Sequence, residues 1–164
     1  MTERRRRDPL RPLREVNARR RALSELRGPR EALLLARLSA FAATVPLLMR
    51  LPIPRLAALI TRPPRRPAPS PGEIERFERL VTLAPRVAHP LVRTGCLTRG
   101  VTLFWFLRRA GLDVELRFGL DPGARARPGD GGHCWLTLRG EPFLEKEDPR
   151  PRFPEIYRLP LGAG

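Results

Sequence analysis

The stretch that decides the fold is residues 95–119, GCLTRGVTLFWFLRRAGLDVELRFG. Apolar side chains recur at helical spacing over Cys96–Ala110, and Gly111 follows them as a C-cap, so we predict a helix here. Over Asp113–Gly119 apolar and charged residues alternate, which is the pattern of a half-buried strand. A helix followed directly by a strand is therefore the centre of the predicted fold.

The sequence predicts two more strands after this one. A loop rich in Gly, Pro and Arg, Leu120–Gly131, precedes a second strand at Gly132–Arg139, and Gly140 makes the turn into a third strand at Glu141–Glu145. This order of elements predicts an α+β fold, in which the helix packs on a small antiparallel sheet and extra helices precede it.

The most apolar part of the chain is residues 31–60. Glu31–Met49 has helical spacing that Pro46 interrupts, and Arg55–Ile60 predicts a short second helix. A membrane span needs about 20 apolar residues without a break, and Arg37 and Pro46 break this run. We therefore predict a core or groove-covering helix, with an interfacial membrane helix as the alternative.

Shifts in composition divide the chain into four parts. They are an Arg-rich arm at 1–30 that we predict to be disordered, the apolar helical segment at 31–60, a Pro-rich linker at 61–72 and a cysteine-site domain at 73–164. At the end of the linker, Ser70 and Glu73 form a capping-box signature. The helix that they begin is predicted to run from Gly72 to about Leu83, where Pro85 ends it.

The charge of the chain narrows the classes of partner. The net charge is +15, and 31 of the 32 basic residues are arginine, which we interpret as a solvated, Arg-biased surface. No aromatic residue precedes Phe41, so the arm has nothing on which bases can stack, and we expect no nucleic-acid partner. Peripheral membrane contact through the arm and the apolar helix is the alternative interpretation.

The few cysteines and histidines set expectations for redox state and metals. Two cysteines are too few for a disulfide scaffold, and the first residues have no signal-peptide pattern, so we expect a cytoplasmic protein with reduced thiols. Membrane association is the alternative location. Two cysteines and two histidines without paired spacing do not build a zinc site, so we expect no metal and no cofactor.

Cys96 and His133 are the candidate catalytic pair. Cys96 follows Gly95 in the first turn of the predicted helix, where the helix dipole and unpaired N–H groups stabilise a thiolate or an oxyanion. His133 begins the second strand, on the face opposite Cys134, which we predict to be a buried structural thiol. A cysteine with a histidine base points to nucleophilic acyl-transfer chemistry.

A third group would orient the histidine, and the register of the predicted hairpin ranks the candidate acids. If Arg139–Glu141 is a three-residue loop, Trp135 faces Glu145, and Glu145 lies diagonal to His133 within side-chain reach. A two-residue loop would shift the parity and move Glu145 to the other face of the sheet.

These residues together resemble a specific family. Cys96-Leu97-Thr98-Arg99 opens an apolar helix that closes with Leu107–Leu112, the following strand ends in Phe118-Gly119, and Gly132-His133-Cys134-Trp135 opens the next strand. This pattern resembles the transglutaminase-like proteins of lasso peptide biosynthesis, the B2 leader-peptidase type. The resemblance implies a papain/transglutaminase-like core.

The resemblance also implies a site and an activity. Carried over by position, Cys96 is the nucleophile, His133 is the general base and Glu145 stands in the place of the acid, where that family usually has Asp; Asp148 stays open as the alternative. The implied enzyme is a cysteine peptidase that removes the leader of a ribosomally made precursor peptide, or transfers an acyl group from it. Its implied partners are that precursor and, in trans, a leader-recognition protein and a macrolactam synthetase. A non-catalytic binding or scaffold protein of the same fold is the alternative function.

Overall fold

The computed structural model describes residues 23–61, 67–88, 91–92, 95–123 and 131–160. They form the helices α2 (Pro29–Leu48), α3 (Ile53–Ile60), α4 (Pro71–Val87) and α5 (Cys96–Ala110), and the strands β1 (Val114–Leu120), β2 (Gly132–Leu138), β3 (Glu141–Phe143) and β4 (Glu155–Leu159). The four strands make one antiparallel sheet in the order β3-β2-β1-β4. The predicted α+β class is confirmed.

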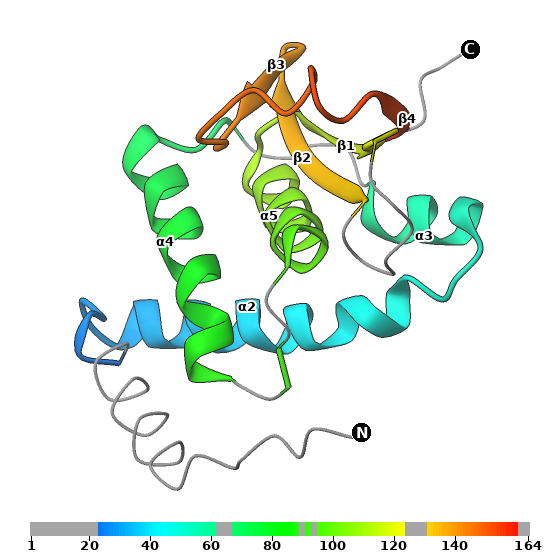
Figure 1. Ribbon diagram of the computed structural model, residues 1–164. Coiled ribbons are helices and arrows are strands. Elements are labelled where there is room, and N and C mark those ends of the chain that lie inside the picture. Colours follow the sequence, from blue (N-terminus) through cyan, green and yellow to red (C-terminus); the bar gives the residue numbers. More distant parts are fainter. Residues whose placement is uncertain (1–22, 62–66, 89–90, 93–94, 124–130, 161–164) are drawn as a thin grey trace, which may run out of the picture.

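Helix α5 occupies the centre of the fold, between the sheet and α2 (Figure 1). Its bounds are those predicted, and Gly111 ends it in the left-handed conformation at φ 107°. Leu103, Phe104 and Leu107 are fully buried in the core. Because α5 is apolar on several sides, it packs against β1, β2, α2 and α4 at once.

Two helices run through prolines that were predicted to interrupt or end them. Pro46 lies inside α2, and α4 continues past Pro85 to Val87. Both prolines lie in the last turn of their helix: each removes one N–H bond to the preceding turn, and each helix ends two residues later. The predicted capping box is confirmed, since Ser70 Oγ accepts from Glu73 N–H and Glu73 Oε2 accepts from Ser70 N–H at 2.9 Å.

Helix α2 buries one side against α4 and α5 and leaves the other side open. Leu38 and Val45 are buried, whereas Leu33 and Leu47 are exposed. By length and composition α2 is able to cross a membrane, and 28% of the apolar window that meets this criterion is buried inside the fold. Its buried side contacts α4 and α5, and both the core helix and the interfacial helix stay predictions.

The predicted division of the chain at 30, 60 and 72 stays a prediction. Most of the Arg-rich arm, residues 1–22, and part of the linker, residues 62–66, lie outside the described residues. Both α2 and α3 contribute side chains to the same hydrophobic core as α4 and α5.

The β2–β3 hairpin has the shorter of the two turns considered from the sequence. Its turn is the two residues Arg139 and Gly140, both at positive φ (54° and 85°), and Leu138 pairs with Glu141. Two-residue turns with two positive φ values match the right-handed twist of the strands that they join, which favours them over a three-residue loop. Of the two turns considered, the two-residue turn is therefore the one present, and β3 ends at Phe143 rather than at Glu145.

Candidate active site

Cys96 is the first residue of α5, directly after the N-cap Gly95. No side chain caps this end of the helix, so the N–H groups of the first turn point at the region around the thiol. Cys96 Sγ lies 3.9 Å from the carbonyl oxygen of Gly132 on β2, and the residue is partly exposed. The helix end and the strand therefore meet at the thiol.

Gly100 explains how α5 comes so close to β2. A Cβ atom at this position would lie 2.4 Å from Cys134 Sγ, so a larger residue fits only if the Cys134 side chain, the strand or the helix shifts. Cys134 Sγ in turn lies 3.5 Å from the carbonyl oxygen of Cys96. Cys96 thus contacts the residues on both sides of His133 in the chain. A glycine inside an apolar helix is a sequence signal for such a close approach, and our sequence prediction did not use it.

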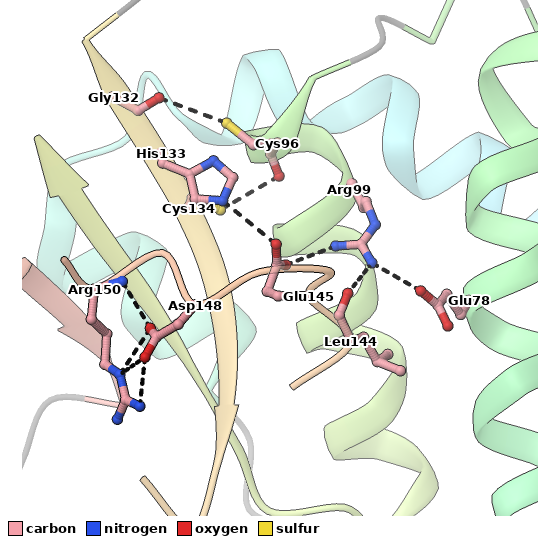
Figure 2. Close-up of polar contacts among 10 residues, drawn as sticks. All are labelled: Glu78, Cys96, Arg99, Gly132, His133, Cys134, Leu144, Glu145, Asp148 and Arg150. Carbon is pink, nitrogen blue, oxygen red and sulfur yellow. Dashed lines mark hydrogen bonds and ion pairs between the residues drawn. The ribbon is translucent and has the colours of Figure 1, made fainter. Parts of the chain in front are cut away.

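His133 extends from β2 with a quarter of its side chain exposed. The ring of Phe153 lies 5.0 Å from its ring, and Trp135 stacks beside it at an interplanar angle of 12°. His133 Nε2 is 3.6 Å from Glu145 Oε2. Figure 2 shows the imidazole between Cys96 and Glu145, with Nδ1 on the side of the thiol. One ring nitrogen therefore faces the acid and the other faces the nucleophile.

Glu145 reaches this place by leaving the strand. Continued past Phe143, the observed β2–β3 ladder would put Glu145 opposite Cys134, on the core face. Leu144 has φ 59° instead, which breaks the ladder and turns the chain. The carboxylate of Glu145 then lies beside His133 with 14% of its side chain exposed.

Arg99, one turn after Cys96 on α5, holds Glu145. Its guanidinium donates to Glu145 Oε1 at 3.0 Å, to the carbonyl oxygen of Leu144 at 2.6 Å and to Glu78 Oε1 at 3.1 Å. One oxygen of Glu145 thus faces Arg99 and the other faces His133 (Figure 2). From the sequence we named Arg99 only as part of the motif at the start of the helix and assigned it no role, and we did not consider Glu78 on α4.

Asp148, the alternative acid, faces a different partner. It forms an ion pair with Arg150 at 2.8 Å, with 43% of its side chain exposed. Hydrogen bonds from the side chain and backbone of Arg150 hold the pKa of Asp148 below its ordinary value. In Figure 2 this pair lies apart from the imidazole, so the geometry favours Glu145.

Cys134 is the buried thiol that the strand pattern predicted. Burial, with smaller contributions from the nearby Cys96 and Glu145, raises the pKa of Cys134 far above its ordinary value. This residue therefore remains a neutral thiol at physiological pH and packs as a small apolar side chain.

The expectation that the chain binds no metal concerns the whole chain, and the structure describes only part of it. Among the described residues no group of three or more His, Cys, Asp or Glu side chains is placed to hold a metal ion. His89, to which we assigned no role, lies outside these residues.

A comparison with protein families agrees with this geometry. The model of the transglutaminase-like superfamily matches residues 35–158, a region that includes Cys96, His133 and Glu145. No curated protein and no solved structure matches the chain.

Proposed function

Because the chain belongs to the transglutaminase-like superfamily, whose members are typically cysteine peptidases or transglutaminases, we propose that it catalyses acyl transfer from a peptide amide through Cys96. The observation that carries this proposal is the position of His133 between the thiol of Cys96 and the carboxylate of Glu145. A nucleophile, a base and an orienting acid in this order are the parts of a cysteine catalytic triad.

In the proposed first step, His133 takes the thiol proton of Cys96 at Nδ1, and the thiolate sulfur attacks the carbonyl carbon of the substrate. A C–S bond forms and the carbonyl oxygen becomes an oxyanion, which the N–H groups at the start of α5 stabilise. When this intermediate collapses, the C–N bond breaks. The imidazolium gives its proton to the leaving amine, and a thioester on Cys96 remains.

In the second step, a water molecule attacks the thioester and gives a proton to His133. The C–S bond breaks, the acid product leaves, and the proton returns to the sulfur of Cys96. An amine in place of water would give a new amide, which is the transferase outcome.

Glu145 and Arg99 act as positioning residues in this account. The carboxylate of Glu145 fixes the orientation of the imidazole and stabilises its charged form. Arg99 ties that carboxylate to α5, the same helix that carries Cys96. The same rigid helix therefore holds both the nucleophile and the acid, which limits the movement of Cys96 relative to Glu145.

For the substrate, we propose a ribosomally made precursor peptide of the lasso type, from which the leader is removed. The support is the resemblance of the Cys96 helix and the His133-x-Trp135 strand start to the leader peptidases of that pathway. The partners proposed on the same basis are a leader-recognition protein and a macrolactam synthetase that act in trans.

Mass spectrometry of a library of synthetic peptide amides incubated with the full chain tests the reaction. We expect cleaved products and a transient acyl adduct on Cys96; adding hydroxylamine as acceptor separates hydrolysis from transfer. Cys96→Ala should abolish turnover, and Cys134→Ala is the matched control that should retain it. Undiminished cleavage by Cys96→Ala would sink the proposal. A precursor peptide tested with a leader-recognition protein probes the substrate alone.

A further inference from the structure

A cavity lies between α2, α4 and the first half of α5, and Gly95, the residue before the nucleophile, is part of its wall. Its volume is about 210 Å³, and its walls are mostly apolar: Ala42, Val81, Pro85 and Val92 line it. Gly95 directly precedes Cys96, the first residue of α5. The cavity therefore lies within one residue of the nucleophile along the chain.

The size of the cavity restricts what it holds. Sites for whole small molecules usually measure about 300 Å³ or more, and this cavity is smaller. An apolar cavity of about 150 Å³ already accepts benzene. One side chain of aromatic size is therefore the occupant that fits.

The wall of the cavity also includes the polar residues Thr82, Thr98 and Arg99. Thr82 donates to the carbonyl oxygen of Glu78, and Arg99 is held by Glu145.

Thr102 differs from Thr82 and Arg99 in its hydrogen bonding. It lines the cavity and is fully buried, and its hydroxyl has no hydrogen-bond partner among the described residues. A buried hydroxyl without a partner is costly, and a ligand that supplies one recovers that cost. Thr102 follows Gly95 by seven residues, or about 10 Å along the helix. A group that enters near Gly95 must therefore be long to reach the hydroxyl.

We propose that this cavity binds one side chain of the peptide substrate close to the scissile bond, with an apolar body and a polar tip that pairs with Thr102. Tyrosine has this shape, since its ring is apolar and its hydroxyl both donates and accepts. This inference rests on the proposed function, because it places a specificity pocket next to Cys96.

The binding test uses two small probes, p-cresol and toluene, which differ by one hydroxyl group. Each is titrated into the full Cys96→Ala chain while the methyl resonances of Thr102, Ala42 and Val92 are followed by NMR. We expect p-cresol to shift these resonances and to bind about tenfold more tightly than toluene. In Thr102→Val, which keeps the shape and removes the hydroxyl, this preference should disappear. Thr44→Val, on the exposed side of α2 and outside the cavity, should retain it.

Two results would contradict the proposed pocket. One is that neither probe shifts the resonances of the cavity residues, and the other is that p-cresol and toluene bind equally well to the chain with Thr102 intact. The peptide library gives a second readout, a preference for Tyr over Phe near the scissile bond that Thr102→Val removes. The proposed function fails separately, through an unreactive Cys96 thiol, which probe binding does not measure.

Discussion

His133 Nε2 and Glu145 Oε2 lie 3.6 Å apart, although the β2–β3 register alone would put Glu145 on the opposite face of the sheet. The contact exists because Leu144, at φ 59°, takes the chain off the ladder just before Glu145. The separation is longer than an N–H···O hydrogen bond, and catalytic contacts of this kind often tighten only when substrate is bound.

Glu145→Gln should lower kcat by about 100-fold, because the amide neither stabilises the charged imidazole nor fixes its tautomer. KM should change little, since Glu145 does not touch the substrate in this account. Steady-state kinetics on the best peptide amide from the library measures both quantities.

Two neighbouring acids are matched controls for that substitution. Glu147→Gln and Asp148→Asn each remove one negative charge from the same loop, and both residues are exposed. We expect each to keep activity within about twofold, as surface substitutions usually do. A large loss in Asp148→Asn together with normal activity in Glu145→Gln would reverse the assignment of the acid.

Arg99→Met should reduce kcat by about tenfold or more while KM stays nearly constant, because Glu145 loses the group that holds it. Arg99→Lys should restore part of the loss, since an ammonium replaces the charge but not the forked contact with Glu145, Leu144 and Glu78. Arg158→Met removes an exposed arginine on β4 and is the control for net charge. An equal loss of kcat in Arg158→Met would contradict a positioning role.

Gly100→Ala should destabilise the fold, because its Cβ would lie 2.4 Å from Cys134 Sγ. Overpacking of this kind costs about 1–3 kcal/mol, and the better helix propensity of Ala offsets about 1 kcal/mol of it. In a Cys134→Ala background the same substitution should cost less, since the clashing sulfur is gone. Urea unfolding of the four chains gives the coupling free energy, which we expect to be about 1 kcal/mol or more. If the two changes in unfolding free energy simply add, the Cβ at position 100 does not clash with the sulfur of Cys134.

Glu31→Gln should lower the free energy of unfolding at pH 7 by about 1–2 kcal/mol. The buried carboxylate of Glu31 accepts from Arg79 at 2.6 Å and from the N–H of Arg27 at 2.9 Å, which joins α2 to α4. These hydrogen bonds hold the pKa of Glu31 below its ordinary value of 4.5, and the one from Arg79 has the largest effect.

The sign of the pH dependence follows from that lowered pKa. The stabilisation is fully present above the ordinary value of 4.5 and is lost as the pH falls through the pKa of the folded state. The difference between wild type and Glu31→Gln should therefore be constant from pH 7 to 6 and shrink below pH 4.5. Urea unfolding across this range measures it, with the exposed Glu75→Gln as control. If the difference in unfolding free energy between wild type and Glu31→Gln grows as the pH falls, the ionised Glu31 carboxylate is not the stabilising group.

The sequence was sufficient for the elements that periodicity and local caps determine. Cys96–Ala110 and its Gly111 cap were predicted residue for residue, because one amphipathic pattern and one glycine define them. The capping box at Ser70 was equally local.

What the sequence did not reveal depends on tertiary contacts and on rare backbone conformations. Gly140 marked the place of the turn, but Arg139 and Leu144 take positive φ without being glycine, so no residue type marked the length of the turn or the bend that delivers Glu145. Arg99 acts through contacts with three separate segments, which no spacing along the chain encodes. Strand β4 was missed because it is short and lies between prolines at the edge of the sheet.

The rate of alkylation by iodoacetamide at pH 6 tests the central claim, that His133 activates Cys96. In the folded chain the signal reports Cys96 alone, because burial raises the pKa of Cys134 and closes access to it. We expect Cys96 to react at least about tenfold faster than free cysteine, and His133→Asn to remove this advantage. A wild-type rate no higher than that of free cysteine, or an undiminished rate in His133→Asn, would contradict the account.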